Sequence, residues 1–542
     1  MSIHYSKLPG FQDLFLDYLY RFDNVSQFFQ NDFRDTEIYK VQFEKIVSSK
    51  RDHREELTKI LMKQYKNYKI SDETEFNIKS LSLENTLAVI TGQQAGICGG
   101  PLYTIYKTIT AVKLAEKMKE NYPEYNFVPV FWMEIDDHDF NEISSVNILD
   151  TKNDLVSVKY DDGKDDDYNR GSISKIILTK EVQSFINSLS ENLRETDFRD
   201  EIIKLLSSTY TEGKRIADAF KELLIYLFDK YGLVIVDPSD PKFKKILKTL
   251  FIHEIENFKV NTDELLARSA GLEEVYHAQV KVKPINLFMT DEDGGRYLID
   301  PIDNQFRLKG KRKRILKKDL LDSINKSPEI FSPNVLFRPI CQDYLFPTAF
   351  YIAGPSEVSY FAQVNCLYEL FNVVQPFIYP RASATVIEKQ LSNLLAKYNL
   401  SFVDILKDEK ILKAQLLNSA SEIDIENLFG ESKKVLELLA EKMGEELKLI
   451  DENLADGVDK SLNKMIQALH SLKIKSENAN EKKNSTTLRQ LDKIVKNLYP
   501  NENYQERVFN WIHFVNKYGF DFITWLFGEL SIEDRNHQIL EM

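Results

Sequence analysis

Cysteine is scarce in this sequence, with three residues among 542, at Cys98, Cys341 and Cys366. They lie on distant segments and form no C-x-x-C pair, which excludes a disulfide framework and a zinc ribbon. Few, scattered cysteines are typical of proteins of the reducing cytosol. We therefore expect a cytoplasmic protein without a metal site.

Long apolar runs and an excess of basic residues are also missing. No stretch of about 18 consecutive apolar residues occurs, and the N-terminus lacks the basic and apolar regions of a signal peptide, so we expect no membrane association. Lysine and arginine total 71 against 84 aspartates and glutamates, a net charge of -13, which disfavours a general nucleic-acid binder. The composition, 43% hydrophobic and 29% charged, is that of a folded protein, and the length predicts several domains.

The sequence does contain an alternation of short apolar strands and helices over residues 84–385, after a helical segment at 1–83. This alternation predicts an α/β core with a parallel sheet whose strands are buried on both faces. Two segments of different texture, at about 148–212 and 272–330, interrupt the core. The second carries the basic run 309–318, for which we expect an exposed edge strand or a helix start rather than a phosphate patch.

Residues 386–500 change to helical periodicity. Apolar residues recur in steps of three and four from Met443 to Leu472, and a polar segment at 476–487 precedes a second apolar set at 488–498. This pattern predicts an antiparallel coiled coil with its turn at 476–487, and such a seam favours a homodimer. A helical bundle packed on its own core is the alternative. We expect residues 501–542 to form a C-terminal helical cap.

The stretch TGQQAGICGGPLYTIYK (91–107) joins an apolar strand to a helix through a glycine-rich loop. It fits neither G-x-G-x-x-G nor the P-loop pattern. Glycines still allow close backbone approach, and a helix N-terminus favours an anion, so the loop predicts binding of a phosphate or carboxylate. The residues of the loop expected to contact this ligand are Gly92, Gln93, Gln94, Gly96 and Gly100. A glycine-rich crossover without a ligand is the alternative.

A second stretch, FWMEIDDHDFNEI (131–143), places Asp136, Asp137, His138 and Asp139 where a buried strand ends. Ligands of open parallel sheets sit beyond the carboxyl ends of the strands. These side chains suit a general base or the orientation of a polar substrate, and carboxylates also suit a divalent metal. The alternative is a helix start capped by aspartate.

Two further loops end predicted strands in the same way. YIAGPSEVSYF (351–361) brings Gly354 and Glu357 to the sheet edge, and YPRASATVIEK (379–389) brings Arg381, a candidate for a second anion site. Four such loops at one edge predict an active-site cleft.

These four stretches, with LDKIVKNLYPNENYQERVFNWIHFVNKYG (491–519), resemble the BshC family, the cysteine-adding enzymes of bacillithiol biosynthesis, over essentially the whole chain. The resemblance implies a Rossmann-like core with two connecting-peptide insertions, which would be 148–212 and 272–330, and a homodimer made by the coiled coil. It also implies a ligase that joins the carboxyl group of L-cysteine to the amine of glucosaminyl malate.

Amide formation from a free carboxylate needs activation, and the fold resembles class I aminoacyl-tRNA synthetases, which use ATP. The resemblance implies ATP, with magnesium, as co-substrate, and it puts Tyr103 and Tyr106 at the histidine positions of the H-x-G-H signature of those enzymes. Lys107 or Arg381 would supply positive charge to the pyrophosphate. His138, with Asp137 or Asp139, would accept a proton from the attacking amine.

Two other functions remain open from the sequence. One is a nucleotidyl- or sugar-nucleotide transferase on the same fold. The other is a binding or scaffold protein that has a Rossmann-like pocket but catalyses nothing.

Overall fold

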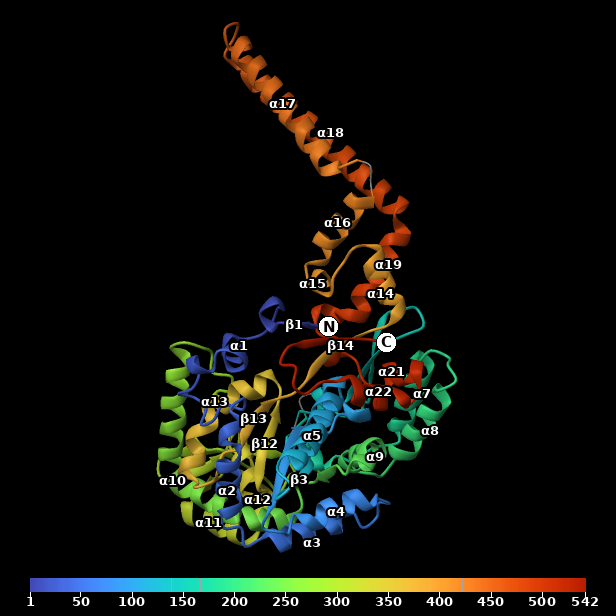
Figure 1. Ribbon diagram of the computed structural model, residues 1–542. Coiled ribbons are helices and arrows are strands. Elements are labelled where there is room, and N and C mark those ends of the chain that lie inside the picture. Colours follow the sequence, from blue (N-terminus) through green and yellow to red (C-terminus); the bar gives the residue numbers. More distant parts are fainter. Residues whose placement is uncertain (138, 166–167, 421–422) are drawn as a thin grey trace. The chain divides into compact units, whose positions relative to one another are not determined.

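The computed structural model describes residues 1–137, 139–165, 168–420 and 423–542. The chain divides into two compact units, Met1–Thr385 with Tyr504–Leu540, and Val386–Asn503 with Glu541–Met542 (Figure 1). In the described part of the chain, no helix is both long enough and apolar enough to cross a membrane.

The centre of the first unit is a parallel sheet with the strand order β13-β12-β2-β3-β6. The strands are β2 (Thr86–Gln93), β3 (Asn126–Met133), β6 (Val234–Val236), β12 (Thr348–Ala353) and β13 (Phe377–Pro380). The chain starts in the middle of the sheet at β2, extends to β6 on one side and then returns to β12 and β13 on the other. This is the doubly wound Rossmann order, and it confirms the predicted α/β core.

The neighbouring strands β2 and β12 mark the point where the strand order reverses. In doubly wound sheets, the crevice outside the carboxyl ends of the strands at this switch point is where ligands bind. The strands themselves are buried because almost every residue in them is apolar, as expected for a sheet covered on both faces.

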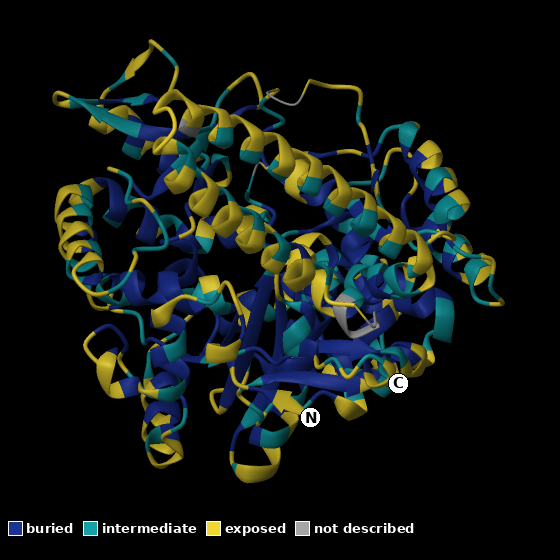
Figure 2. Ribbon diagram, turned by 90° about the horizontal axis from the view of Figure 1, so that it is seen from above, coloured by how far each residue is buried: buried dark blue, intermediate teal, exposed yellow. Residues whose placement is uncertain are grey.

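Helices α2 (Tyr39–Ser48) and α5 (Leu102–Asn121) cover the sheet through one apolar cluster that includes Phe43, Val89 and Phe350. The N-terminal helical segment therefore contributes to the core. In Figure 2 the dark-blue strands lie among helices whose outer faces are yellow. Further helices of this unit are α1 (Asp13–Tyr20), α3 (Arg54–Gln64), α4 (Asp72–Ser80), α9 (Ile216–Phe228), α10 (Pro241–Glu273), α12 (Arg338–Leu345) and α13 (Pro355–Leu370).

Two segments depart from the strand–helix alternation. The first has the hairpin β4 (Ser145–Leu149) and β5 (Leu155–Lys159), then α7 (Glu181–Asn192) and α8 (Arg199–Thr209). The second is an antiparallel sheet in the order β10-β9-β8-β7-β11. Its elements are β7 (Leu287–Thr290), β8 (Arg296–Ile302), β9 (Gln305–Leu308), β10 (Arg314–Ile315), α11 (Lys317–Lys326) and β11 (Phe331–Pro333). The basic run 309–318 supplies the edge strand β10 and the start of α11, as predicted.

The C-terminal segment returns to the first unit. It forms α20 (Gln505–Val508), α21 (Ile512–Tyr518), α22 (Asp521–Glu529) and the strand β15 (His537–Glu541). Strand β15 pairs antiparallel with β1 (Ser2–Ile3), so the predicted helical cap also contains a strand.

The second unit is helical, and its longest helices, α17 (Ile425–Lys448) and α18 (Asn453–Lys483), lie antiparallel side by side (Figure 1). Its remaining helices are α14 (Lys389–Lys397), α15 (Phe402–Ile405), α16 (Glu409–Ala420) and α19 (Ser485–Leu498). The predicted antiparallel coiled coil is confirmed, but the predicted position of its turn is wrong. The chain reverses at 449–452, and most of 476–487 is helical.

Candidate functional site

At the switch point, Lys107 of α5 joins the loop after β2 to the loop after β12. Its Nζ donates to Gly92 O at 2.8 Å and Gln93 Oε1 at 3.0 Å, and it forms an ion pair with Glu357 Oε2 at 2.5 Å. The ammonium has three N–H groups, so these acceptors use all of them. Gln93 and Lys107 of the stretch 91–107 thus meet Glu357 of the stretch 351–361, as the loop pattern predicts.

Glu357 lies in the first turn of α13 and is held from three sides. Besides Lys107, it accepts from Gly354 N at 2.7 Å and from the Tyr351 hydroxyl at 2.7 Å. Burial opposes ionisation of this carboxyl, but the Lys107 ammonium and the two hydrogen bonds outweigh it and lower the pKa of Glu357. Gly354 lies beside this group, since a Cβ there would be 3.3 Å from Glu357 Oε2 and 3.6 Å from Arg381 Nε.

The positive charges predicted to act on pyrophosphate are both compensated within the protein. Lys107 pairs with Glu357, and Arg381 forms a two-pronged pair with Glu506, with Nη1–Oε2 at 3.0 Å and Nη2–Oε1 at 2.5 Å. Arg381 and Glu506 are also almost fully buried. Their charges shape the local field, but they do not offer an unpaired cation to a ligand.

The two tyrosines of α5 have different surroundings. The Tyr103 hydroxyl accepts a hydrogen bond from Gln93 Nε2 at 3.1 Å, and the Arg381 guanidinium lies 5.6 Å from the centre of the Tyr103 ring. Tyr106 is fully buried, and its hydroxyl has no hydrogen-bond partner among the described residues. Tyr103 lines a cavity beside the glycine-rich loop, and Tyr106 does not.

The glycine-rich loop packs against the C-terminal segment. Trp511 Nε1 donates to Cys98 O at 2.8 Å, Asn510 Nδ2 donates to Gly100 O at 2.6 Å, and Leu102 N donates to Phe509 O at 2.8 Å. The first N–H group of α5 is therefore already used.

Beside this loop lies a cavity of about 260 Å³, hereafter the loop cavity. Its lining residues are Gly96, Gly100, Pro101, Tyr103, Glu142, Ser145, Val146, Asn147, Arg507, Val508 and Asn510. The guanidinium of Arg507 has no hydrogen-bond or ion-pair partner within the described ranges, so it is the cation that this cavity offers.

The aspartates that follow β3 make different contacts. Asp136 pairs with the buried Lys244 at 2.5 Å, and Asp137 accepts a hydrogen bond from Gln94 Nε2 at 2.6 Å. Asp139 is exposed and caps α6 (Phe140–Ile143) by accepting from Glu142 N at 3.2 Å, the capping role that was the alternative prediction. The predicted base His138 lies outside the described residues.

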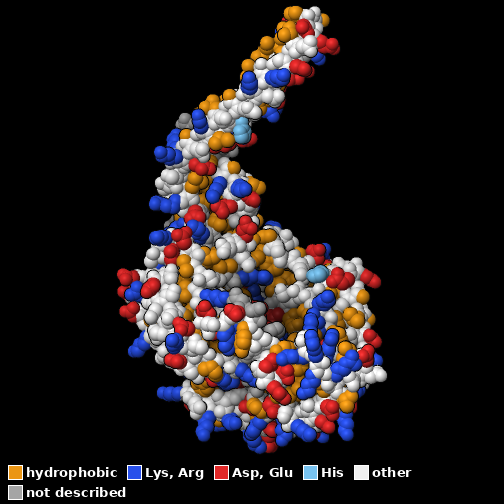
Figure 3. All heavy atoms as spheres, turned by 180° about the vertical axis from the view of Figure 1, so that it is seen from behind, with side chains coloured by type: hydrophobic (Ala, Val, Ile, Leu, Met, Phe, Trp, Pro, Cys, Tyr) orange, Lys and Arg blue, Asp and Glu red, His pale blue; other side chains and the backbone are white. Residues whose placement is uncertain are grey.

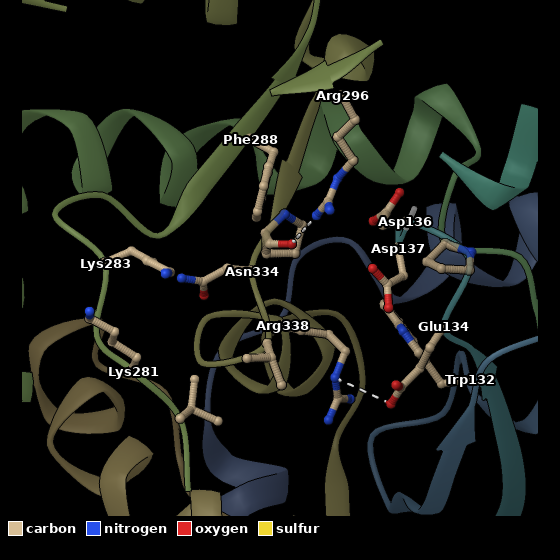
Figure 4. Close-up of a pocket in the computed structure, with 14 residues that line it drawn as sticks. Trp132, Glu134, Asp136, Asp137, Lys281, Lys283, Phe288, Arg296, Asn334 and Arg338 are labelled. Atoms are coloured by element: carbon tan, nitrogen blue, oxygen red, sulfur yellow. Dashed lines mark hydrogen bonds and ion pairs between the residues drawn. The ribbon is translucent and has the colours of Figure 1, made fainter. Parts of the chain in front are cut away.

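The main cavity, about 320 Å³, opens where β3 ends and reaches the second segment that interrupts the core (Figure 4). Its lining residues are Trp132, Glu134, Asp136, Asp137, Pro238, Val280, Lys281, Lys283, Phe288, Arg296, Pro333, Asn334, Val335 and Arg338. Of the described residues that the sequence predicted, Asp137 and its neighbour Asp136 line this cavity. Figure 4 shows the carboxylates of the β3 end close to Arg338 of α12 and Arg296 of β8, with Lys281 and Lys283 on the other side of the cavity.

Glu134 links the main cavity to the switch point. Its Oε1 lies 3.4 Å from Arg338 Nε, and a Cβ added at Gly92 would lie 2.9 Å from the same oxygen. Burial raises the pKa of the Glu134 carboxyl; Arg338 opposes this, and Glu357 adds to it. A carboxyl with a raised pKa at the edge of a cavity is suited to accepting a proton near neutral pH.

Arg338 and Arg296 set the positive side of this region. Arg338 donates to the hydroxyls of Tyr360 at 2.7 Å and Tyr351 at 3.2 Å. Arg296 lies 3.7 Å from the centre of the Phe288 ring and donates to Ser332 Oγ at 2.9 Å. Burial lowers the pKa of Arg296 to about 10, although Asp136 and Asp137 oppose this, so the group stays charged at neutral pH.

The sequence prediction missed Glu134, Arg296, Arg338 and the two cavity lysines. Glu134 had a detectable signal, since it stands two residues before Asp136 at the end of a strand, where residues two apart share a face. The others come from distant segments without a motif. Among the described residues, no group of three or more His, Cys, Asp or Glu side chains is arranged to hold a metal ion.

Comparisons with known proteins agree over the full length. The model for "Bacillithiol biosynthesis BshC, N-terminal Rossmann-like domain" matches residues 1–382, and that for the "C-terminal coiled-coil domain" of BshC matches residues 384–542. A protein named "Putative cysteine ligase BshC" from Salinibacter ruber is 34% identical, covering 98% of this chain and 97% of the relative. Relatives of the same name from Chloroherpeton thalassium (36% identical, 94% and 92% covered) and Prosthecochloris aestuarii (32% identical, 98% and 96% covered) are similar.

Proposed function

The chain belongs to the BshC family of bacillithiol biosynthesis, and from this premise we propose that it is a ligase that joins the carboxyl group of L-cysteine to the amine of glucosaminyl malate. The observation that carries the proposal is the main cavity, which is lined by the carboxylates at the end of β3. This strand lies beside β2, one of the two strands at the switch point of the doubly wound sheet. A cationic amine is attracted to such a carboxylate cluster, and a carboxylate there accepts the proton that the ammonium must lose before its nitrogen can attack.

Within this proposal, Glu134 is the proton acceptor and Asp137 orients the amine. The pKa of Glu134 is raised because the surrounding protein removes water from its carboxyl, so it holds a proton more readily than a fully exposed glutamate. Asp137 is fixed by Gln94, which gives the predicted Gln94 a positioning role. Lys107 and Glu357 act as a buried pair that fixes the loops after β2 and β12 in register.

We propose ATP, with magnesium, as the activating co-substrate. The cysteine carboxylate would displace pyrophosphate from ATP to give cysteinyl adenylate, and the amine would then displace AMP to form the amide. The loop cavity is our candidate for the phosphates, because it is lined by the glycine-rich loop and by Arg507, whose guanidinium has no hydrogen-bond or ion-pair partner in the described chain.

We also propose that the active form is a homodimer assembled through α17 and α18. Both helices expose large apolar side chains on the paired hairpin, among them Val435, Leu438, Leu439 and Met443. Exposed apolar side chains in this number indicate a surface that another chain covers. Figure 3 shows hydrophobic side chains, in orange, among the charged side chains along this hairpin.

The proposal is tested by incubating the purified chain with L-cysteine, glucosaminyl malate and ATP–Mg, and detecting the amide and AMP by mass spectrometry. We expect one AMP for each amide formed. A wild-type protein that forms no amide contradicts the ligase function, and ADP in place of AMP contradicts the adenylate. Continued amide formation without any nucleotide contradicts ATP as activator.

The role of Glu134 is tested with Glu134→Gln, which keeps the shape of the side chain and removes its basicity. We expect kcat to fall by roughly 10²–10⁴, the usual contribution of a general base, with little change in the KM for the amine. Glu292→Gln, an exposed carboxylate of the inserted sheet, is the control and should retain full activity. His138→Asn tests the base predicted from the sequence; a large loss there with normal activity in Glu134→Gln assigns proton transfer to the imidazole instead.

A further inference from the structure

Two lysines of the main cavity, Lys281 and Lys283, have no acidic partner in the described part of the chain. Both lie between α10 and β7, on the wall opposite the carboxylates of the β3 end (Figure 4). Those carboxylates are each already engaged, Asp136 with Lys244 and Glu134 with Arg338. The cavity therefore has an acidic side whose charges are partly compensated and a basic side whose two lysines are uncompensated.

The segment that carries these lysines is fixed at both ends. Val280 N donates to Gln363 Oε1 at 2.9 Å, and Gln363 Nε2 donates to Val280 O at 2.9 Å. Six residues later, Asn286 N donates to the buried Glu254 Oε1 at 2.8 Å. Anchors on both sides limit where the chain between them can go, so the backbone that carries the two lysines is held at the cavity wall.

We propose that Lys281 and Lys283 bind the acidic half of the amine acceptor and make the enzyme selective for an acceptor that carries two carboxylates at a distance from its amine. The inference rests on the proposed ligase function and adds the residues that determine acceptor specificity. Unpaired ammonium groups attract carboxylates without the loss of an existing ion pair, and the carboxylates of the β3 end repel them. The acceptor can then enter in one orientation only, with its amine toward Glu134 and its acidic half toward the lysines.

The test compares two acceptors, glucosaminyl malate and methyl glucosaminide, which has the same amine but no carboxylate. We expect wild-type protein to prefer the malate-bearing acceptor. The double variant Lys281→Met/Lys283→Met should raise the KM for glucosaminyl malate by about 100-fold, roughly tenfold for each lost charge-assisted hydrogen bond, with kcat nearly unchanged. The KM for methyl glucosaminide should stay the same. Lys318→Met, an exposed lysine of α11, is the control and should change neither acceptor.

Several outcomes overturn the inference. One is an unchanged KM for glucosaminyl malate in the double variant; another is an equal rise of KM for both acceptors, which would indicate general damage to the site. Calorimetric titration of glucosaminyl malate separates the inference from the proposed function, because it needs no turnover. If wild-type protein forms no amide yet binds glucosaminyl malate, and the double variant loses that binding, the ligase function is wrong and the acidic subsite stands. If wild-type and variant proteins bind alike, or neither binds, the subsite is wrong.

Discussion

Three lysines of the first unit are almost fully buried, and they differ in how their charge is compensated. Lys107 is 4% exposed, and Lys221 and Lys244 are each 2% exposed. Lys107 and Lys244 pair with carboxylates at 2.5 Å. Lys221 has no carboxylate within ion-pair distance among the described residues; its Nζ lies 3.9 Å from the centre of the Tyr65 ring and donates to Gln64 O at 3.4 Å. Burial lowers the pKa of Lys221 to about 7, although Asp237 opposes this.

Lys221→Met should therefore stabilise the protein in a pH-dependent way. Between about pH 7 and pH 10.4 the unfolded chain binds a proton at this lysine that the folded chain does not, so wild-type stability rises with pH. Below pH 7 both states bind it, and the cost of the buried charge, of the order of 4 kcal/mol, is fully present. We expect the variant to gain stability over wild type at pH 6.5 and to lose most of that gain at pH 9.5, measured by chemical denaturation. Lys204→Met, an exposed lysine of α8, should show no such trend. A stability difference that does not change with pH would mean that Lys221 is charged throughout.

The sequence predicted which side chains meet at the switch point, but it did not predict that their positive charges are compensated by carboxylates of the protein. Gln93, Lys107 and Glu357 were named from their loops and do meet. That Lys107 has no hydrogen-bonding capacity left, and that Arg381 is used by Glu506, depends on partners 250 and 125 positions away (357 − 107 and 506 − 381). Local sequence carries no record of such pairings, so the compensation of these cations could not be predicted.

The glycine-rich loop lies between a strand and a helix as predicted, but the structure gives another reason for the glycine at position 96. The sequence predicts that Gly96 leaves room for a ligand. In the structure, a Cβ at Gly96 would lie 2.9 Å from Gly100 Cα, so the loop's own backbone occupies that space. Cys98, Gly99 and Gly100 also adopt positive φ values, which turn the chain tightly between β2 and α5.

Gly96→Ala should consequently reduce stability as well as ligand binding. The added methyl group forces Gly96 and Gly100 apart, and overpacking of this kind costs about 1–3 kcal/mol. Gly271→Ala is the control: Gly271 lies within α10 with nothing within 4 Å of the added Cβ, so it should stabilise by up to about 1 kcal/mol. Thermal unfolding of both variants decides. A Gly96→Ala protein as stable as wild type, but unable to bind nucleotide, would restore the view that this glycine only makes room for a ligand.

In the coiled coil, the sequence predicts the pairing of the helices but not the position of the turn. Its antiparallel pairing could be predicted from apolar spacing, but its turn could not, because Leu447, Ile450 and Leu454 keep the same three–four spacing straight through the reversal at 449–452. Leu449 and Ile450 are 88% and 76% exposed there. Apolar periodicity predicts which face of a helix is apolar. It does not predict the position of a turn between two helices when that turn contains no glycine or proline.

For the molecule as a whole, the class of the sheet followed from strand–helix alternation, whereas the position of its switch point did not. Strands β2 and β12 are more than 250 residues apart in the chain and pair directly in the sheet. The same pairing brings the loops after β2 and β12 together, and the second inserted segment then closes the main cavity from the far side. The site is therefore a product of topology, and the sequence alone indicates only the strand ends that contribute to it.

Assembly is the remaining property of the whole chain that the exposed apolar side chains predict. Leu438, Leu439 and Met443 of α17 are 64%, 51% and 47% exposed, so replacing all three with glutamine removes little buried surface and should leave the fold intact. If these side chains form the interface between two copies, the triple variant should lose about half its mass in light scattering while its circular dichroism stays unchanged, since the apolar contact area drives the association. Val260→Gln, an equally exposed apolar residue of α10 (53% exposed), is the control and should remain dimeric. A triple variant that stays dimeric would place the interface on another surface. A wild-type protein that is already monomeric would contradict the homodimer itself.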